Sequence, residues 1–327
     1  MTNTMKKIGV LTSGGDSPGM NACIRAVVRT GIYHGLEVYG IRSGYNGLIN
    51  NDFIKLDSHH VSNIIQRGGT ILKTARSKEF ITKSGREKAY QNLKEHGLDG
   101  LVVIGGNGTF TGADIFIREF DFPIIGAPGT IDNDLYGTDA TIGYDTALNT
   151  VMEAVDKIRD TASSHDRLFF VEVMGRDAGF IALRSGIAGG AEDILIPETE
   201  THIDELIAIL EKGFRRNKKS SIIIVSEGDD AGGAFEVAAK VKEKYNHYDT
   251  RVTVLGHIQR GGSPSSFDRI LASTLGYEAV NALLEGRRGE MVGQINKEVV
   301  FTPFEKSIKH NKDIRHDLLE MARILAT

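Results

Sequence analysis

The stretch Leu101-Val102-Val103-Ile104-Gly105-Gly106-Asn107-Gly108 decides the expected fold. It is a short apolar run that leads into a glycine-rich turn, and a segment with helical spacing follows it. A strand that is apolar on both faces is typical of a parallel sheet covered by helices on both sides. The stretch therefore predicts a buried strand, then a tight turn, then a helix.

The same pattern recurs along the chain, where short apolar runs alternate with amphipathic segments. The runs that we predict as strands are residues 8–12, 37–41, 101–104, 123–126, 168–173, 194–196, 222–226 and 252–255. The clearest helices are predicted at 145–159 and 203–214. This alternation predicts an α/β protein with doubly wound, mainly parallel sheets, in which ligands bind where the strands end.

The composition narrows the class of protein. A length of 327 residues suggests about two domains, and a net charge of −4 argues against a general nucleic-acid binder. The single cysteine, Cys23, cannot form an intramolecular disulfide, so a reducing compartment is expected. The polar first residues and the short apolar run after them predict neither a signal peptide nor a membrane span. A cytoplasmic location is therefore expected.

Two glycine turns, Gly14-Gly15 and Gly105-Gly106-Asn107-Gly108, each follow a predicted strand and precede a predicted helix. Glycine lets the backbone approach an anion, and a helix N-terminus offers free N–H groups. Neither turn is a Walker A loop. Each alone is as consistent with a tight connection as with a phosphate site, but two at corresponding places favour phosphate.

The loop Pro128-Gly129-Thr130-Ile131-Asp132-Asn133-Asp134 follows another predicted strand. Phosphoryl transfer to a hydroxyl needs a carboxylate that accepts the proton and cations around the transferred group. Asp132 could be this base, and Asp134 could orient a neighbour or hold a metal-bound water. Two aspartates that cap an acidic turn are the simpler interpretation of such a spacing alone.

Several cationic side chains lie in or beside turns and suit phosphate binding, although each alone is more often a solvated residue. These are Arg76, Arg167, Arg176, Arg251 and Arg260. His257 precedes Arg260 in a glycine-rich loop, where a sugar phosphate could be bound. The basic run from Arg215 to Lys219 is either a solvated helix end or a second anion site.

Taken together, these motifs closely resemble those of the bacterial ATP-dependent 6-phosphofructokinases over nearly the whole chain. The matching stretches are LTSGGDSPGMNA at 11–22, VIGGNGTFTGA at 103–113, PGTIDND at 128–134, VMGRDAGFIAL at 173–183 and LGHIQRGGSPS at 255–265, with Asp268 and Arg269. Several long motifs in the family's order leave little room for chance.

The resemblance implies two Rossmann-like domains with the active site in the cleft between them. Residues 1–142 and 257–307 would form a large nucleotide-binding domain, and 143–256 and 308–327 a smaller sugar-phosphate domain. It also implies a homotetramer with active sites shared between subunits. The reaction would be transfer of the γ-phosphoryl of Mg²⁺-ATP to the 1-hydroxyl of fructose 6-phosphate, in glycolysis.

By position, the resemblance makes Asp132 the base, with Thr130 and Arg176 stabilising the transferred group and Asp134 assisting through the metal shell. The nucleotide positions are Gly15, Tyr45, Arg76, Ser77, Gly106, Asn107, Gly108 and Thr109. The sugar-phosphate positions are Thr130, Ile131, Asp132, Met174, Gly175, Arg176, Glu227, His257, Ile258, Gln259 and Arg260, with Arg167 and Arg251 reaching in from a neighbouring subunit. The effector positions, for ADP or phosphoenolpyruvate, are Arg25, Arg29, Arg159, Gly190, Glu192, Arg216, Lys218, Lys219 and Ser220.

Two glycines favour ATP over pyrophosphate as donor. Pyrophosphate-using relatives carry Asp at the position of Gly108 and Lys at that of Gly129. A carboxylate at 108 would crowd and repel the α-phosphate of ATP, and a lysine at 129 would supply charge that pyrophosphate needs.

The chain departs from the family at two positions. Asn107 stands where the family has a metal-site aspartate, and Mg²⁺ prefers carboxylate oxygens. The lost contact is worth about 1.5–3 kcal/mol, which predicts an active but weakened kinase. Ser58 stands where relatives often have an arginine of the effector site, so a poor response to phosphoenolpyruvate is expected.

Two other functions stay open from the sequence. A catalytically poor homologue could bind both ligands and regulate an active partner subunit, as Asn107 suggests. A non-enzymatic nucleotide-binding module is the third hypothesis, and the sugar-phosphate motifs argue against it.

Overall fold

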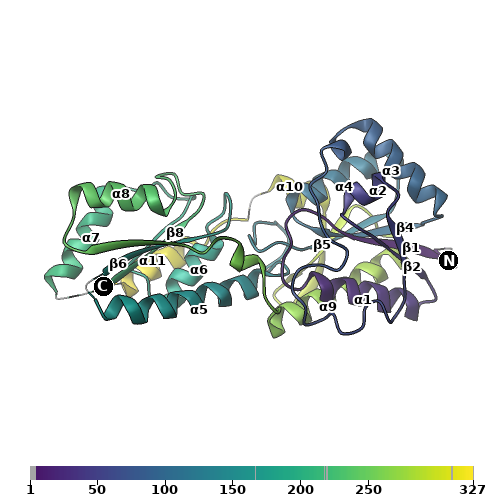
Figure 1. Cartoon of the computed structure of the whole chain (residues 1–327). Helices are drawn as coiled ribbons and strands as arrows, with labels where there is room; N and C mark the ends of the chain where they lie inside the picture. Colours follow the sequence, from purple (N-terminus) through teal and green to yellow (C-terminus); the bar gives the residue numbers. More distant parts are fainter. Residues whose placement is uncertain (1–4, 166, 217, 219, 311, 327) are drawn as a thin grey trace. The chain divides into compact units, whose positions relative to one another are not determined.

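The structure is a computed structural model that describes residues 5–165, 167–216, 218, 220–310 and 312–326 (Figure 1). The chain divides into two compact units. Unit 1 comprises residues 1–131, 135–146 and 260–312, and unit 2 comprises residues 132–134, 147–259 and 313–327. The resemblance suggested divisions near residues 142, 257 and 307, a few positions from these. No helix among the described residues has the length and apolar character needed to span a membrane.

Unit 1 is built on a seven-stranded sheet with the order β11-β10-β5-β4-β1-β2-β3. Its strands are β1 (Lys7–Thr12), β2 (Glu37–Ile41), β3 (Phe53–Leu56), β4 (Gly100–Gly105), β5 (Ile124–Pro128), β10 (Glu290–Ile295) and β11 (Glu298–Pro303). Its helical elements are α1 (Met20–Tyr33), α2 (Tyr45–Ile49), η1 (Glu79–Ile81), α3 (Lys83–Glu95), α4 (Asn107–Phe120), α9 (Ser266–Leu284) and α10 (Phe304–Lys309).

Apolar side chains cover both faces of this sheet. Helices α1 and α9 pack on one face, and α3, α4 and α10 pack on the other, each over its own apolar cluster (Figure 1). Every residue of β4 is buried, as the apolar run at residues 101–104 predicts. The central strands run parallel, whereas β3 and β11 are antiparallel to their neighbours.

Unit 2 holds a four-stranded parallel sheet with the order β7-β8-β6-β9. Its strands are β6 (Arg167–Val173), β7 (Asp193–Leu195), β8 (Ser221–Ser226) and β9 (Asp249–Val254). Its helical elements are α5 (Tyr144–Ser163) and η2 (Gly256–Arg260), which both cross from one unit to the other, and α6 (Phe180–Gly189), α7 (Ile203–Arg215), α8 (Ala234–Lys244) and α11 (His316–Leu325). Helices α7 and α8 cover one face of the sheet over a shared apolar cluster.

The predicted α/β class with mainly parallel sheets is confirmed, and all eight predicted strands are present with ends shifted by up to three residues. The sequence interpretation missed β3, β10 and β11. These strands are half-exposed over much of their length, or interrupted by Gly293, so they lack the two-sided apolar run that marks a central parallel strand.

Candidate functional site

The two glycine turns of unit 1 are neighbours. Strands β1 and β4 pair in parallel, so the turns that follow them emerge at the same edge of the sheet. The Thr109 hydroxyl donates to the Ser13 carbonyl at 3.2 Å, and the Ser13 N–H donates to the Ile104 carbonyl at 3.0 Å. Among the residues that the structure describes, none accepts a hydrogen bond from the Gly14 or Gly15 N–H. These N–H groups suit an anion.

The glycines of the second turn, and Gly129 after β5, differ in the space around them. A Cβ at Gly105 would lie 2.4 Å from Thr109 Oγ1 and 2.5 Å from the Ser13 carbonyl oxygen, so only glycine fits there. A Cβ at Gly108 would meet nothing within 4 Å. A Cβ at Gly129 would press on Ile104 at 3.0 Å. Packing therefore explains Gly105 and restricts Gly129, whereas Gly108 leaves open space for a ligand.

Tyr45, a predicted nucleotide residue, is a buried part of the frame. Its hydroxyl donates to the Thr109 carbonyl at 2.5 Å, and its ring stacks on Phe80 at 3.8 Å. Burial raises the pKa of the Tyr45 phenol far above its usual value. The tyrosine thus supports the first turn of α4, and its contact with a nucleotide stays a prediction.

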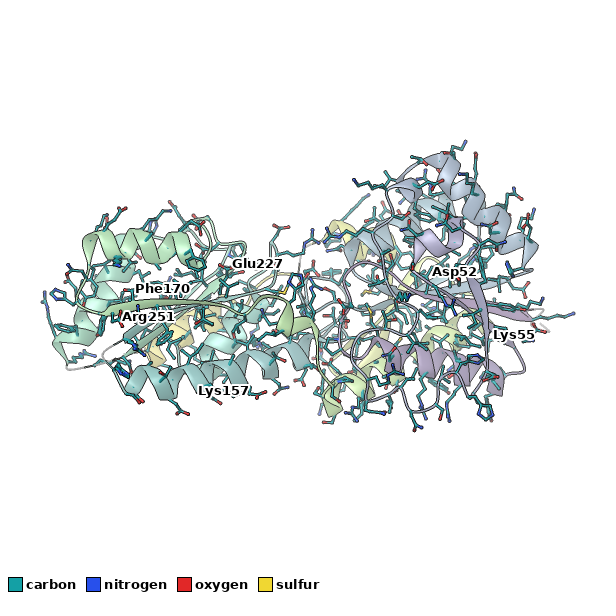
Figure 2. The ribbon with its side chains drawn as sticks, in the orientation of Figure 1. Asp52, Lys55, Lys157, Phe170, Glu227 and Arg251 are labelled. Atoms are coloured by element: carbon teal, nitrogen blue, oxygen red, sulfur yellow. The ribbon has the colours of Figure 1, made fainter. Side chains whose placement is uncertain are left out.

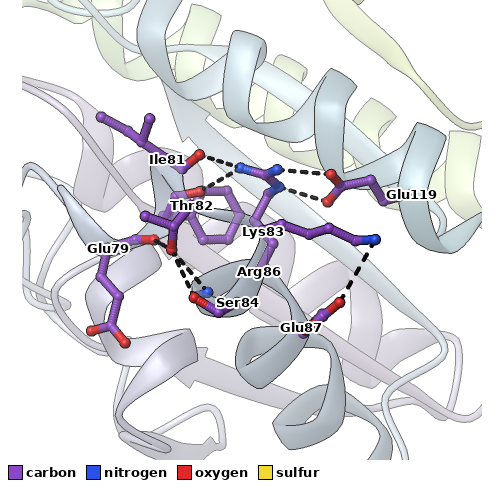
Figure 3. A network of polar contacts seen from close by, with 10 residues as sticks. Glu79, Ile81, Thr82, Lys83, Ser84, Arg86, Glu87 and Glu119 are labelled. Carbon is purple, nitrogen blue, oxygen red and sulfur yellow. Dashed lines mark hydrogen bonds and ion pairs between the residues drawn. The ribbon is translucent and has the colours of Figure 1, made fainter.

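Arg76 and Ser77 lie shortly before η1, and the backbone of η1 is held by a network of charged side chains around Arg86 (Figure 3). The Arg86 guanidinium forms two hydrogen bonds with Glu119, at 2.6 and 2.7 Å, and also donates to the carbonyls of Phe80 and Ile81. The Ser77 hydroxyl accepts a hydrogen bond from the Phe80 N–H at 3.2 Å. Arg76 is exposed. The network leaves the Arg76 side chain available to a ligand.

The carboxylate loop begins beside the second glycine turn. The Gly129 N–H donates to the Gly105 carbonyl at 2.9 Å, and a Cβ at Gly106 would lie 3.5 Å from Thr130 Cβ. The Thr141 hydroxyl donates to the Thr130 carbonyl at 2.6 Å. The structure thus brings Thr130 next to a predicted phosphate turn within unit 1.

The remaining loop residues differ in exposure. Ile131 and Asp132 are buried, Asp134 is half-buried, and Asn133 adopts a left-handed conformation with φ 55°. Among the described residues, no three His, Cys, Asp or Glu side chains gather as a metal site. One or two carboxylates together with substrate phosphates are the usual Mg²⁺ ligands. Asp134, in unit 2, and Asn107, in unit 1, stay predicted ligands of such an ion.

In unit 2, the turn at residues 174–179 follows β6 and carries Arg176. The Glu227 carboxylate accepts hydrogen bonds from the Gly175 N–H at 3.2 Å and the Arg176 N–H at 2.8 Å. The Met174 N–H donates to the buried Gln259 side chain at 3.2 Å. Arg176 is exposed and adopts a left-handed conformation with φ 53°. The structure thus brings these five predicted substrate residues together.

Arg167 and Arg251 lie at the opposite end of this sheet. Both contact the Asp249 carboxylate, at 3.3 and 2.7 Å. Arg167 begins β6, and Arg176 follows its last residue, so about 20 Å of strand separates them. Figure 2 shows Arg251 beside Phe170 and Glu227 toward the other end of the sheet. Within one chain, Arg167 and Arg176 therefore lie at opposite ends of β6, and Arg251 lies opposite Phe169 on the neighbouring strand.

The loop at residues 257–260 is divided between the units. His257 and Ile258 lie in unit 2, where Ile258 is exposed. Arg260 lies in unit 1, where its guanidinium donates to the Asp16 carbonyl at 3.3 Å and lies over Gly15. The structure thus places Arg260 against a turn predicted for nucleotide, and its role toward a sugar phosphate stays a prediction.

The predicted effector residues form separate groups. In unit 2, the Arg159 guanidinium donates to the Gly190 carbonyl at 2.9 Å, and Lys218 pairs with the buried Glu192 at 2.5 Å. In unit 1, burial and the neighbouring Arg29 both lower the pKa of Arg25. Arg216 is exposed, Ser220 is half-buried, Ser58 is exposed, and Lys219 lies outside the described residues.

Two carboxylates that the sequence interpretation left without a role support this architecture. Asp268 is fully buried and accepts hydrogen bonds from the N–H groups of Gly143 and Thr146 at the start of α5. Burial raises the pKa of Asp268. Glu198 accepts a hydrogen bond from the Gly179 N–H at 2.9 Å. Glu198 lies just after β7, so the rule that chemistry follows strand ends could have found it.

Known proteins resemble the chain over nearly its whole length. The sequence pattern of the phosphofructokinase family matches residues 7–283. The ATP-dependent 6-phosphofructokinase 2 of Bacteroides thetaiotaomicron is 59% identical over 323 residues, which cover 99% of each chain. The ATP-dependent 6-phosphofructokinase 1 of Thermus thermophilus is 57% identical and covers 98% of this chain and 100% of its own.

Solved structures of phosphofructokinases also resemble this chain. Phosphofructokinase from Saccharomyces cerevisiae aligns with a TM-score of 0.86 at 41% identity over 93% of this chain, which spans 45% of that longer chain. A pyrophosphate-dependent phosphofructokinase from Marinobacter aquaeolei aligns with a TM-score of 0.84 at 22% identity, which shows the shared fold alone. The family pattern and the relatives that match nearly the whole chain agree with the motifs, so the chain belongs to the phosphofructokinase family.

Proposed function

We propose that this chain is an ATP-dependent 6-phosphofructokinase, which transfers the γ-phosphoryl of Mg²⁺-ATP to the 1-hydroxyl of D-fructose 6-phosphate. The products are fructose 1,6-bisphosphate and ADP, and the reaction is a step of glycolysis. The observation that carries the proposal is the 59% identity over 99% of the chain with a relative of that name. We expect the enzyme in the cytoplasm, as its single buried cysteine fits a reducing compartment.

The acceptor hydroxyl must lose a proton as it attacks, and we assign this proton to the Asp132 carboxylate. The transferred phosphoryl group spreads negative charge over its oxygens, and we assign its stabilisation to Thr130 and Arg176. When it is bound, Mg²⁺ would neutralise part of the negative charge of the phosphates. Asp134 would hold this ion, assisted by the Asn107 amide oxygen.

Unit 1 would bind the nucleotide through its two glycine turns, Arg76 and Ser77. The N–H groups of Gly14 and Gly15, which have no acceptor within the described residues, support this assignment. The open space at Gly108 supports ATP as the donor, because an aspartate there would fit the protein and still repel the α-phosphate.

Unit 2 would bind the sugar phosphate through Met174, Gly175, Arg176, Glu227 and His257. The N–H groups of Met174 and Gly175 already donate to Gln259 and Glu227, so these two residues would meet the substrate through other atoms. Arg260 would be a further cation for the substrate.

Arg167 and Arg251 would serve a neighbouring subunit. The separation of Arg167 from Arg176 along β6 supports this assignment, because it holds these two cations of one chain at opposite ends of the strand. We therefore propose a homotetramer in which each active site includes these two arginines from a neighbouring subunit.

We also propose an effector site that binds ADP or phosphoenolpyruvate, with a weak response of the activity to phosphoenolpyruvate. Strong inhibition by phosphoenolpyruvate in a saturation assay would contradict this.

A coupled assay with fructose 6-phosphate, run separately with ATP and with pyrophosphate, tests the proposal. We expect turnover with ATP alone. Asp132→Asn should lower kcat by about 100- to 10,000-fold while the protein still binds fructose 6-phosphate. Gly108→Asp should raise the KM for ATP at unchanged stability. Binding of both ligands without turnover by the unaltered chain would instead support a regulatory subunit, and nucleotide binding alone would support a non-enzymatic module.

A further inference from the structure

The turn at residues 174–179 is held by side chains from three other segments rather than by sheet pairing. Glu227 follows β8, Gln259 lies in η2, and Glu198 follows β7. Together they accept hydrogen bonds from the N–H groups of Met174, Gly175, Arg176 and Gly179. The backbone on both sides of the Arg176 Cα is thus tied to fixed points of unit 2.

The end of this turn that leads into α6 depends on Glu198. Both of its carboxylate oxygens lie close to the Gly179 N–H, at 2.9 and 3.1 Å. A Cβ at Gly179 would lie 2.5 Å from Ile196 Cβ, so the turn presses against the end of β7. Gly179 is also the N-cap of α6, where a negative charge is favourable.

The turn needs such support because Arg176 is strained. A left-handed conformation costs a non-glycine residue about 1–2 kcal/mol, and Arg176 has φ 53°. Strain of this kind persists only where the surroundings fix the backbone. Glu227 fixes the first half of the turn, and Glu198 fixes the second half.

We infer that Glu198 is a positioning residue for the phosphoryl transfer, which acts by holding the turn in the conformation that presents the Arg176 guanidinium. The inference rests on the proposed role of Arg176. A misplacement of a catalytic group by about 1 Å can lower a rate by about 100-fold. Glu198 is exposed, so its replacement leaves the core of unit 2 intact.

The alternative is that Glu198 only caps a helix. A matched control exists in the same unit, because Glu172 accepts a hydrogen bond from the Ala234 N–H at 2.8 Å at the start of α8. Helix α8 carries none of the proposed site residues, and Glu172 is half-buried, so its loss should cost at least as much stability as that of Glu198. A rate effect that came from lost stability would therefore appear in both variants.

The experiment compares Glu198→Ala with Glu172→Ala, measuring kcat, the KM for ATP and hydrogen exchange of residues 174–180. We expect Glu198→Ala to lower kcat by about tenfold or more at an unchanged KM for ATP, and to increase exchange in the turn. Glu198→Gln keeps an acceptor and should restore most of the rate. Glu172→Ala should lower the unfolding midpoint and leave both kcat and the turn unchanged.

A double variant identifies the route of the effect. If Glu198 acts through Arg176, Glu198→Ala should cost nothing further in an Arg176→Ala background. Equal loss of kcat in Glu198→Ala and Glu172→Ala, full additivity with Arg176→Ala, or unchanged exchange in the turn would each overturn the inference. Absence of turnover in the unaltered chain would overturn the proposed function instead, and the exchange comparison would still test the inference.

Discussion

The turns that we propose as ligand sites are held in different ways in the two units. In unit 1, the turns after β1 and β4 are held by backbone contacts and the Thr109 hydroxyl, and the Gly14 and Gly15 N–H groups face no acceptor within the described residues. In unit 2, carboxylates already occupy the N–H groups of Gly175 and Arg176. In the proposed function, unit 1 would therefore meet an anion with backbone N–H groups, whereas unit 2 would meet it with the Arg176 side chain, because carboxylates already bind the backbone N–H groups there.

The largest expected effect is a loss of stability when the close backbone packing of the turns in unit 1 is disturbed. Gly105→Ala would force a Cβ to within 2.5 Å of the Ser13 carbonyl oxygen, and we expect it to lower the free energy of unfolding by about 3 kcal/mol. Gly108→Ala meets nothing within 4 Å and should raise stability by about 0.5 kcal/mol. Urea unfolding of both variants measures the contrast. Equal midpoints would show that the close packing of the turns does not require Gly105.

The next effect concerns the charge that the turn of unit 1 lacks. Asn107→Asp adds a carboxylate at the first residue of α4, where it should strengthen Mg²⁺ binding and raise kcat by about 10- to 100-fold at limiting metal. The helix N-terminus also favours the charge, so the variant should fold at least as well. A titration of rate against Mg²⁺ measures the gain. A rate no higher than that of the unaltered chain at any Mg²⁺ concentration, limiting or saturating, would refute the weakening.

The same contrast explains what sequence reasoning could find. Each turn of unit 1 consists of residues that are adjacent in the sequence, so an apolar run followed by glycines was enough to predict it. The turn of unit 2 depends on Glu198 and Gln259, which lie far from Arg176 along the chain. The position of Glu198 after β7 marks it as a candidate site residue, but no local pattern links its carboxylate to an N–H after β6. The sequence also did not show that position 105 requires glycine, because the Ser13 carbonyl oxygen that a Cβ would meet follows a different strand, β1.

A smaller effect tests the ion pair between Arg86 and Glu119, which joins α3 to the end of α4 in unit 1. The hydrogen bonds from Arg86 lower the pKa of Glu119 below its usual value near 4.5. The unfolded chain binds this proton more tightly, so the pair stabilises the fold above about pH 4.5 and loses that contribution as the pH falls through the lowered pKa.

We therefore expect Glu119→Gln to cost about 1.5 kcal/mol at neutral pH, which allows for partial solvent screening, and nothing in acid. Urea midpoints across this pH range measure the difference. As a control, Glu290→Gln removes a similar pair with Arg287, at 2.8 and 3.1 Å, which is more exposed and should matter less. A loss for Glu119→Gln that does not change with pH would contradict the ionic role.

The variant with the smallest expected effect tests the comparison most directly, because it removes one hydrogen bond between the two turns of unit 1. Thr109→Val deletes the hydroxyl that donates to the Ser13 carbonyl and keeps the shape of the side chain. We expect a loss of about 1 kcal/mol in stability and a higher KM for ATP. Thr111→Val is the control, because its hydroxyl donates to the Asn107 carbonyl within α4 and joins no second turn. If both variants left the KM for ATP unchanged, the backbone alone would hold the two turns together, and unit 1 would need no side chain for this purpose.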